Sequence, residues 1–129
     1  MPVDDNVDLL VSPRDVQDLP NDPGHPSVRV LSHGSMEVRW FRPTSDQWHE
    51  PHDRDELYFV VSGTARFRRG SLAGPFDEKT VDYRGPKVVM VSAGDVMFVP
   101  AGAPHNFDQT SPDFAVWATF YGPEGGENR

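Results

Sequence analysis

Short apolar stretches separated by turn residues run through most of this chain of 129 residues. In several stretches apolar and polar positions alternate, as in a half-buried strand over 36–42, which would place Met36, Val38 and Trp40 inward. Glycine and proline pairs such as Gly74-Pro75 break the stretches at short intervals. Strands are therefore predicted over 28–31, 36–42, 57–62, 65–69, 87–91, 96–99 and 114–121.

Many short strands with turn signals between them predict an all-β sandwich or small barrel. Residues 53–59 could be drawn as a helix with His52 and Glu56 on one face, but Pro51 and the apolar run over 58–61 favour a strand. We expect one domain: a β-barrel over 27–122, an irregular Asp- and Pro-rich arm over 1–26 with a short strand or turn at 7–11, and a flexible tail over 123–129.

Charge and composition narrow the function classes. The net charge of −8 disfavours a nucleic-acid partner. Arg66, Arg68 and Arg69 are interpreted as a solvated strand face rather than a phosphate-binding patch. No apolar run approaches the roughly 20 residues that cross a bilayer, and no signal peptide is recognised, so a cytoplasmic location without membrane contact is expected. The absence of cysteine excludes disulfides and thiolate ligands.

Candidate chemistry gathers in two stretches, 48–63 and 94–105. The first holds two histidines and several carboxylates, and the second ends at His105. Imidazole and carboxylate groups suit Fe, Mn, Ni, Cu or Zn. Side chains alternate along a strand, so Glu50 and His52 point to the same side and His49 points to the other. We hypothesise that the two stretches meet and hold a metal ion, whereas the isolated His25 and His33 are interpreted as surface or core residues.

The two stretches also carry a pair of spaced motifs that resemble those of small single-domain cupins. The second motif is formed by Gly94, Pro100, Gly102 and His105, with Gln109 where asparagine is usual, and the first by His52, Glu56 and Gly63. Two positions depart from the pattern: Glu50 takes the first histidine slot and Thr44 the leading glycine slot. The resemblance covers residues 44–109, and it is specific because both motifs are present.

The resemblance implies a jelly-roll β-barrel, usually a homodimer, with one divalent metal ion per chain, either Fe, Mn, Ni or Zn. It also implies His52, Glu56 and His105 as metal ligands. The fourth ligand is Glu50, which side-chain alternation favours, or His49, which would need a β-bulge to re-aim it. Alternatively Glu50 stays unbound and acts as a catalytic general base.

Four aromatic residues could line the barrel cavity or simply pack its core, namely Tyr58, Phe98, Phe107 and Trp117. Two classes of function follow. In the first, the chain is a metal-dependent enzyme acting on a small organic molecule, with dioxygenase chemistry ahead of isomerase or decarboxylase chemistry. In the second, it is a non-catalytic module that holds a small molecule or a structural metal. The enzyme is favoured, although a fold alone does not decide function.

Overall fold

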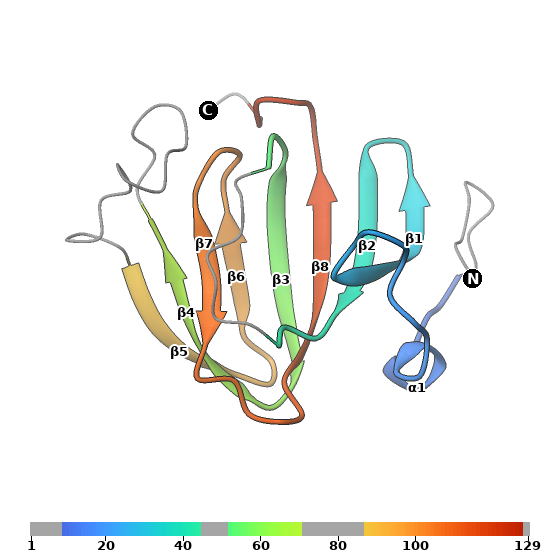
Figure 1. The fold of residues 1–129 in the computed structure, drawn as a ribbon. Helices are drawn as coiled ribbons and strands as arrows, with labels where there is room; N and C mark the ends of the chain where they lie inside the picture. Colours follow the sequence, from blue (N-terminus) through green and yellow to red (C-terminus); the bar gives the residue numbers. More distant parts are fainter. Residues whose placement is uncertain (1–8, 45–51, 71–86, 128–129) are drawn as a thin grey trace.

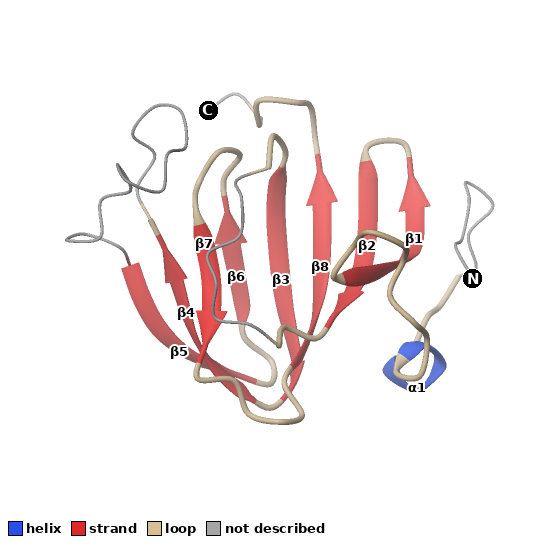
Figure 2. Cartoon of the chain, viewed as in Figure 1, coloured by secondary structure: helices blue, strands red, loops and turns tan. Residues whose placement is uncertain are grey.

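The computed structural model describes residues 9–44, 52–70 and 87–127, and these form an almost entirely β structure (Figures 1 and 2). The prediction of an all-β fold is confirmed, and each predicted strand has a counterpart. The elements are α1 (Pro13–Val16), β1 (Ser27–His33), β2 (Met36–Phe41), β3 (Asp55–Ser62), β4 (Thr64–Arg69), β5 (Lys87–Ser92), β6 (Val96–Val99), β7 (His105–Asp108) and β8 (Ala115–Tyr121).

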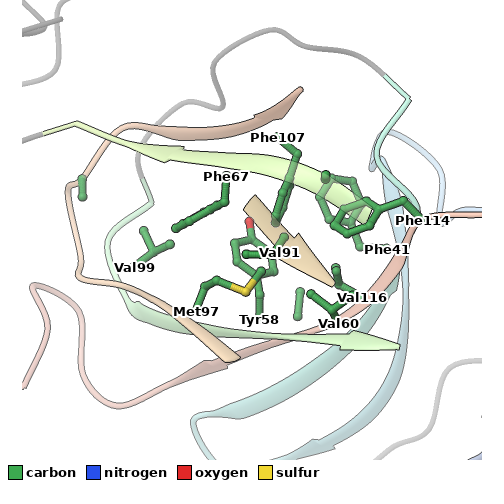
Figure 3. Packing of buried hydrophobic residues seen from close by; sticks show 13 residues of the cluster. Phe41, Tyr58, Val60, Phe67, Val91, Met97, Val99, Phe107, Phe114 and Val116 are labelled. Carbon is green, nitrogen blue, oxygen red and sulfur yellow. The ribbon is translucent and has the colours of Figure 1, made fainter. Parts of the chain in front are cut away.

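The strands form two antiparallel sheets, as in a jelly roll. The larger sheet has the order β1-β2-β8-β3-β6 and the smaller one the order β5-β4-β7. The main core cluster lies between the sheets and includes Tyr58, Phe67, Phe107 and Val116 (Figure 3). Strand β8 lies between β2 and β3. The larger sheet therefore combines β1 and β2 from the first third of the chain and β8 from its last part with β3, which carries most of the first motif.

Gly63, the last residue of the first motif, makes the tight connection from β3 to β4. Its φ is +77°, and a Cβ atom placed there would lie 2.7 Å from the backbone nitrogen of Phe114. Any other residue would therefore meet both an unfavourable backbone conformation and a collision with the chain ahead of β8.

The orientation predicted for β2 is wrong. Glu37, Arg39 and Phe41 face the cavity side of the large sheet, whereas Trp40 packs on its outer side with Val16 and Val28. Val38 packs against the same outer cluster, and Met36 is exposed. The physical reason is that the N-terminal segment covers the outer face, so β2 is buried on both sides.

The N-terminal segment contains α1, a short helix that the sequence did not predict. It begins after Ser12 with Pro13 in its first turn, and the Asp15 carboxylate accepts a hydrogen bond of 2.9 Å from the Ser12 amide. Val16 anchors the helix with only 3% of its surface exposed. Residues 9–11 form no strand, whereas 7 and 8 lie outside the described residues. Over the described ranges, no helix has the length and apolarity needed to cross a membrane.

Candidate metal centre

The fold brings together the two stretches that carry the motifs. Glu56 and Tyr58 lie two residues apart on β3, so their side chains share its inner face. His105 opens β7, and His52 lies just before β3. The loop ahead of β7 is joined to the first stretch directly, because the Gly102 amide donates a hydrogen bond of 2.8 Å to the carbonyl oxygen of His52.

Three potential ligand side chains converge at this point. One nitrogen or oxygen atom from each of His52, Glu56 and His105 lies within 4.8 Å of the other two. The Nε2 atom of His52 is 2.7 Å from Oε1 of Glu56, and Nε2 of His105 is 3.5 Å from the same oxygen. Glu56 and His105 are buried, whereas the His52 side chain is 23% exposed, so the group opens towards solvent on the His52 side.

Backbone carbonyls fix the orientation of both imidazole rings. Nδ1 of His52 lies 2.8 Å from the carbonyl oxygen of Arg54, and Nδ1 of His105 lies 3.0 Å from that of Ala103. A carbonyl oxygen can only accept, so both Nδ1 atoms carry a proton and donate it. Both Nε2 atoms then point at the Glu56 carboxylate with the tautomer that suits metal coordination.

His52 and Glu56 share a proton in the metal-free protein. Two acceptors cannot lie 2.7 Å apart without a hydrogen between them. Burial would lower the pKa of His52, but its hydrogen bond and charge interaction with Glu56 outweigh burial and raise that pKa. Burial also raises the pKa of Glu56, which the contact with His52 offsets only in part. The pair therefore retains one proton between two atoms that are candidate metal ligands.

A cavity of about 290 Å³ opens beside the three ligand candidates. Its size is at the lower end for ligand pockets, which suits a small molecule. Its walls combine the ligand candidates with apolar, polar and charged side chains: His25, Pro26, Ser27, Glu37, Arg39, Phe41, His52, Asp53, Arg54, Glu56, Tyr58, His105, Ala118 and Phe120.

The charged wall of the cavity is paired internally. Arg39 contacts the carboxylates of Glu37 at 2.6 Å and Asp22 at 2.7 Å, and Arg54 contacts Glu37 at 3.0 Å. Burial raises the pKa of Glu37, but hydrogen bonds from Arg39 and Arg54 outweigh it and the net pKa is lowered. Arg54 also lies over the ring of Phe120, 5.5 Å from its centroid. This wall is polar but close to neutral.

Strand register explains why there is a cavity at all. Across the large sheet, Ala118 on β8 pairs with Arg39 on β2 and with Tyr58 on β3. Phe120 lies in the same way between Glu37 and Glu56. The small side chain of Ala118 therefore leaves space between two large polar ones.

Asp55 holds the loop ahead of His105 by accepting hydrogen bonds from two backbone amides. Its Oδ1 accepts a hydrogen bond of 2.9 Å from the Ala101 amide, and its Oδ2 accepts one of 3.0 Å from the Glu127 amide. Asp55 itself is 6% exposed and adjoins Glu56. One buried carboxylate thus joins the loop that carries His105 to the C-terminal segment.

The structure brings together some of the residues that the sequence predicted for this site and places others elsewhere. His52, Glu56 and His105 meet, whereas Glu50 and His49 lie outside the described residues. Tyr58 lines the cavity; Phe107 lies in the core instead, Phe98 is 42% exposed, and Trp117 contributes to the outer face. His25 and His33 are exposed, and His25 also reaches the cavity rim. Sequence reasoning missed the cavity-wall residues Glu37, Arg39, Arg54, Ala118 and Phe120.

The basic residues of β4 are less solvated than predicted. Arg66 makes two hydrogen bonds, of 2.7 and 2.6 Å, to the Asp108 carboxylate on β7. Arg68 donates to the Asn106 side chain at 2.9 Å. These cross-strand pairs hold β4 against β7, so two of the three arginines support the smaller sheet that carries His105.

Comparison with known proteins agrees with the geometry. An uncharacterised protein of Streptomyces coelicolor is 39% identical over 75 residues, which are 58% of this chain and 57% of that protein. Acireductone dioxygenase 1 of Pectobacterium atrosepticum is 32% identical over 114 residues, which are 86% of this chain and 59% of that protein. The chain thus spans less than two thirds of the length of these relatives.

Among solved structures, hydroxypropylphosphonic acid epoxidase from S. wedmorenis has a similar fold. It superposes with a TM-score of 0.57 at 17% sequence identity, covering 93% of this chain and 61% of that one. The family profile described as the cupin domain matches residues 41–121, which include both motifs and every ligand candidate. This chain belongs to the cupin domain family.

Proposed function

We propose that this protein is a metal-dependent cupin enzyme that binds one divalent transition metal ion and acts on a small organic molecule in the adjacent cavity. The observation that carries the proposal is the convergence of His52, Glu56 and His105, with both Nε2 atoms aimed at one carboxylate. Two histidines and one carboxylate with open positions are the ligand set of non-haem Fe(II) oxygenases. Similarity to an acireductone dioxygenase supports dioxygenase chemistry first.

A bound ion would supply Lewis-acid or redox chemistry at the open positions. The protein's own residues have separate tasks. Phe41, Ala118 and Phe120 form the apolar part of the cavity wall and exclude water from the reacting end. Arg54 orients His52 through its backbone oxygen while its side chain closes the cavity wall on Phe120. The cavity volume of about 290 Å³ restricts the substrate to a small molecule.

A fourth protein group completes the proposed centre. Glu50 is the favoured candidate, either as a ligand or as a general base beside the ion, and His49 is the alternative ligand. The two residues can be separated by replacing each with alanine. Loss of a Glu50 ligand should weaken metal binding, and loss of a Glu50 base should spare metal binding but remove turnover. In both cases His49→Ala should do neither, whereas weaker metal binding in His49→Ala alone would make His49 the ligand.

A non-catalytic binding module is the second candidate. It is favoured by the charged cavity wall, where the acid Glu37 is held by two arginines and cannot easily act as a base. Such a module would hold its metal in a closed site with no exchangeable position.

The deciding experiment is elemental analysis of protein purified without chelators, followed by oxygen-uptake screening of the Fe(II)-loaded protein against small organic acids and enediols. Stoichiometric metal that is lost in His105→Ala but kept in the exposed control His33→Ala would support the centre. Oxygen uptake would support the enzyme, and tightly held zinc without uptake would support the module. Metal content unaffected by His105→Ala would refute both.

We also propose that the protein forms a homodimer. Apolar side chains remain exposed on one edge strand of each sheet in the described structure, including Val88 and Met90 on β5 and Val96 and Phe98 on β6. Exposed apolar groups of this kind mark association surfaces. Light scattering of the purified protein gives the mass directly, and a monomer at micromolar concentration would refute this proposal.

A further inference from the structure

Tyr58 presents a buried hydroxyl to the candidate metal centre without being one of its ligand candidates. The residue is only 2% exposed, and its ring packs against Phe107, with centroids 4.9 Å apart, and Phe67, at 6.1 Å. Figure 3 shows the ring held among these aromatic residues and Met97. Packing fixes the ring, so the hydroxyl has a defined position at the cavity floor.

The hydroxyl acts as a hydrogen-bond donor at this position. It lies 3.1 Å from Nε2 of His105. Because Nδ1 of the same ring donates its proton to the Ala103 carbonyl, Nε2 is an acceptor and Tyr58 must donate to it. Burial raises the pKa of Tyr58 well above its usual value, and the charge of Glu56 and a hydrogen bond with Glu56 add to the effect, so the phenol keeps its proton.

Metal binding would take this acceptor away, because the Nε2 lone pair of His105 would point at the ion. The alternative acceptor is the Glu56 carboxylate, which already lies within hydrogen-bonding reach of the Tyr58 hydroxyl and whose Oε1 is 3.5 Å from Nε2 of His105. Glu56 is 1% exposed, so an oxygen of its carboxylate that does not coordinate the ion would have little access to water. A buried carboxylate oxygen without a donor is costly.

We propose that Tyr58 is a positioning residue of the metal centre: it holds the His105 ring in the metal-free protein and transfers its hydrogen bond to the Glu56 carboxylate when metal binds. The inference rests on the proposed function, because it requires a metal at this site. It adds a hydroxyl that contacts both the His105 ring and the Glu56 carboxylate.

The test is Co²⁺ binding by Tyr58→Phe, which removes the hydroxyl and keeps the ring. We expect binding about 10- to 100-fold weaker than in the wild type, as for other groups that orient metal ligands. The visible absorption bands at saturation should also shift, because the Glu56 carboxylate is held differently. The matched control is Tyr121→Phe, which removes a hydroxyl on the opposite face of β8 from Ala118 and Phe120 and should change neither quantity.

Several outcomes would overturn the inference. Co²⁺ affinity within twofold of the wild type with unchanged bands would show that the hydroxyl does not position the ligands. If the wild type itself takes up no Co²⁺, the proposed function fails before the comparison is made, so the two failures are distinguishable.

A second measurement uses the wild type and does not depend on the folding of a variant. Protein labelled with ¹³C at the tyrosine Cζ atom is titrated with Zn²⁺, and the Tyr58 resonance is assigned by its absence in Tyr58→Phe. We expect this resonance to move on loading while keeping the chemical shift of a protonated phenol. A phenolate shift would make Tyr58 a ligand, and an unmoved resonance would place it outside the centre; either result refutes the proposal.

Discussion

Metal binding at this centre should release one proton, and its affinity should therefore depend on pH in a defined way. Nε2 of His52 and Oε1 of Glu56 are 2.7 Å apart and share a proton that the ion must displace. One proton displaced per ion means that affinity falls about tenfold, or about 1.4 kcal/mol, for each pH unit below the pKa of the pair.

The pH window follows from the direction of the two pKa shifts. The pKa of His52 is raised above 6.5 and that of Glu56 above 4.5, so the pair still holds its proton at pH 6. The dependence should therefore be clear between about pH 5.5 and 6.5 and should flatten at higher pH, where the proton has already left.

Competition with a chromophoric chelator measures the Zn²⁺ affinity at each pH. Calorimetry in buffers with different heats of ionisation counts the released protons independently. His33→Asn serves as the control, because His33 is exposed and lies outside the candidate centre, and its slope should match that of the wild type. A flat affinity across the window, or two protons released per ion, would refute the shared-proton reasoning.

Three further predictions concern stability and the cavity. Because folding raises the pKa values of His52 and Glu56, protonation of this pair stabilises the metal-free protein at low pH, and this contribution is lost as pH rises through the folded-state pKa values. The melting temperature of the metal-free protein should therefore fall above pH 6.5, whereas that of the Zn²⁺-loaded protein should rise. Calorimetry showing the same trend in both forms would contradict this. Gly63→Ala should lower the free energy of unfolding, measured by urea denaturation, by about 2–5 kcal/mol, the sum of a left-handed backbone penalty and overpacking. In the control Gly34→Ala, the added Cβ would meet nothing within 4 Å, so the loss should be only about 1–2 kcal/mol. Equal losses would count against the collision at Phe114. Ala118→Leu should fill the cavity, so that Co²⁺ still binds but the affinity of the loaded protein for acetohydroxamate falls at least about tenfold; unchanged hydroxamate affinity would place the ligand elsewhere.

The ligand candidates could be predicted from the sequence because each lies in a short motif of fixed spacing. Glu56 and Tyr58 share a face by the two-residue period of a strand, and His105 follows a proline- and glycine-rich corner that ends the preceding strand. What the sequence lacked was the contact between the stretches, which depends on sheet order. It also could not show that Arg54 supplies the carbonyl oxygen for His52, since any residue offers a backbone oxygen.

The cavity wall could not be predicted from the sequence because β2 is buried on both faces. Alternation alone suggested that Glu37 and Arg39 face solvent, and the arm residue Val16 reversed that assignment by covering the other side. A charged pair on the inner face is tolerated because Arg54 pairs with Glu37 and because Asp22, from the arm, pairs with Arg39. That partner lies 17 residues from Arg39, and no periodicity links the two positions.

The double role of Asp55 has a practical consequence for anyone producing this protein. The same carboxylate receives the Glu127 amide and the amide of Ala101, four residues before His105. Removing Glu127 by truncation would take one of the two amides away from that carboxylate, and so loosen a residue that holds the loop ahead of His105. Shortened variants that retain Glu127 are therefore the safer choice for any assay of metal content.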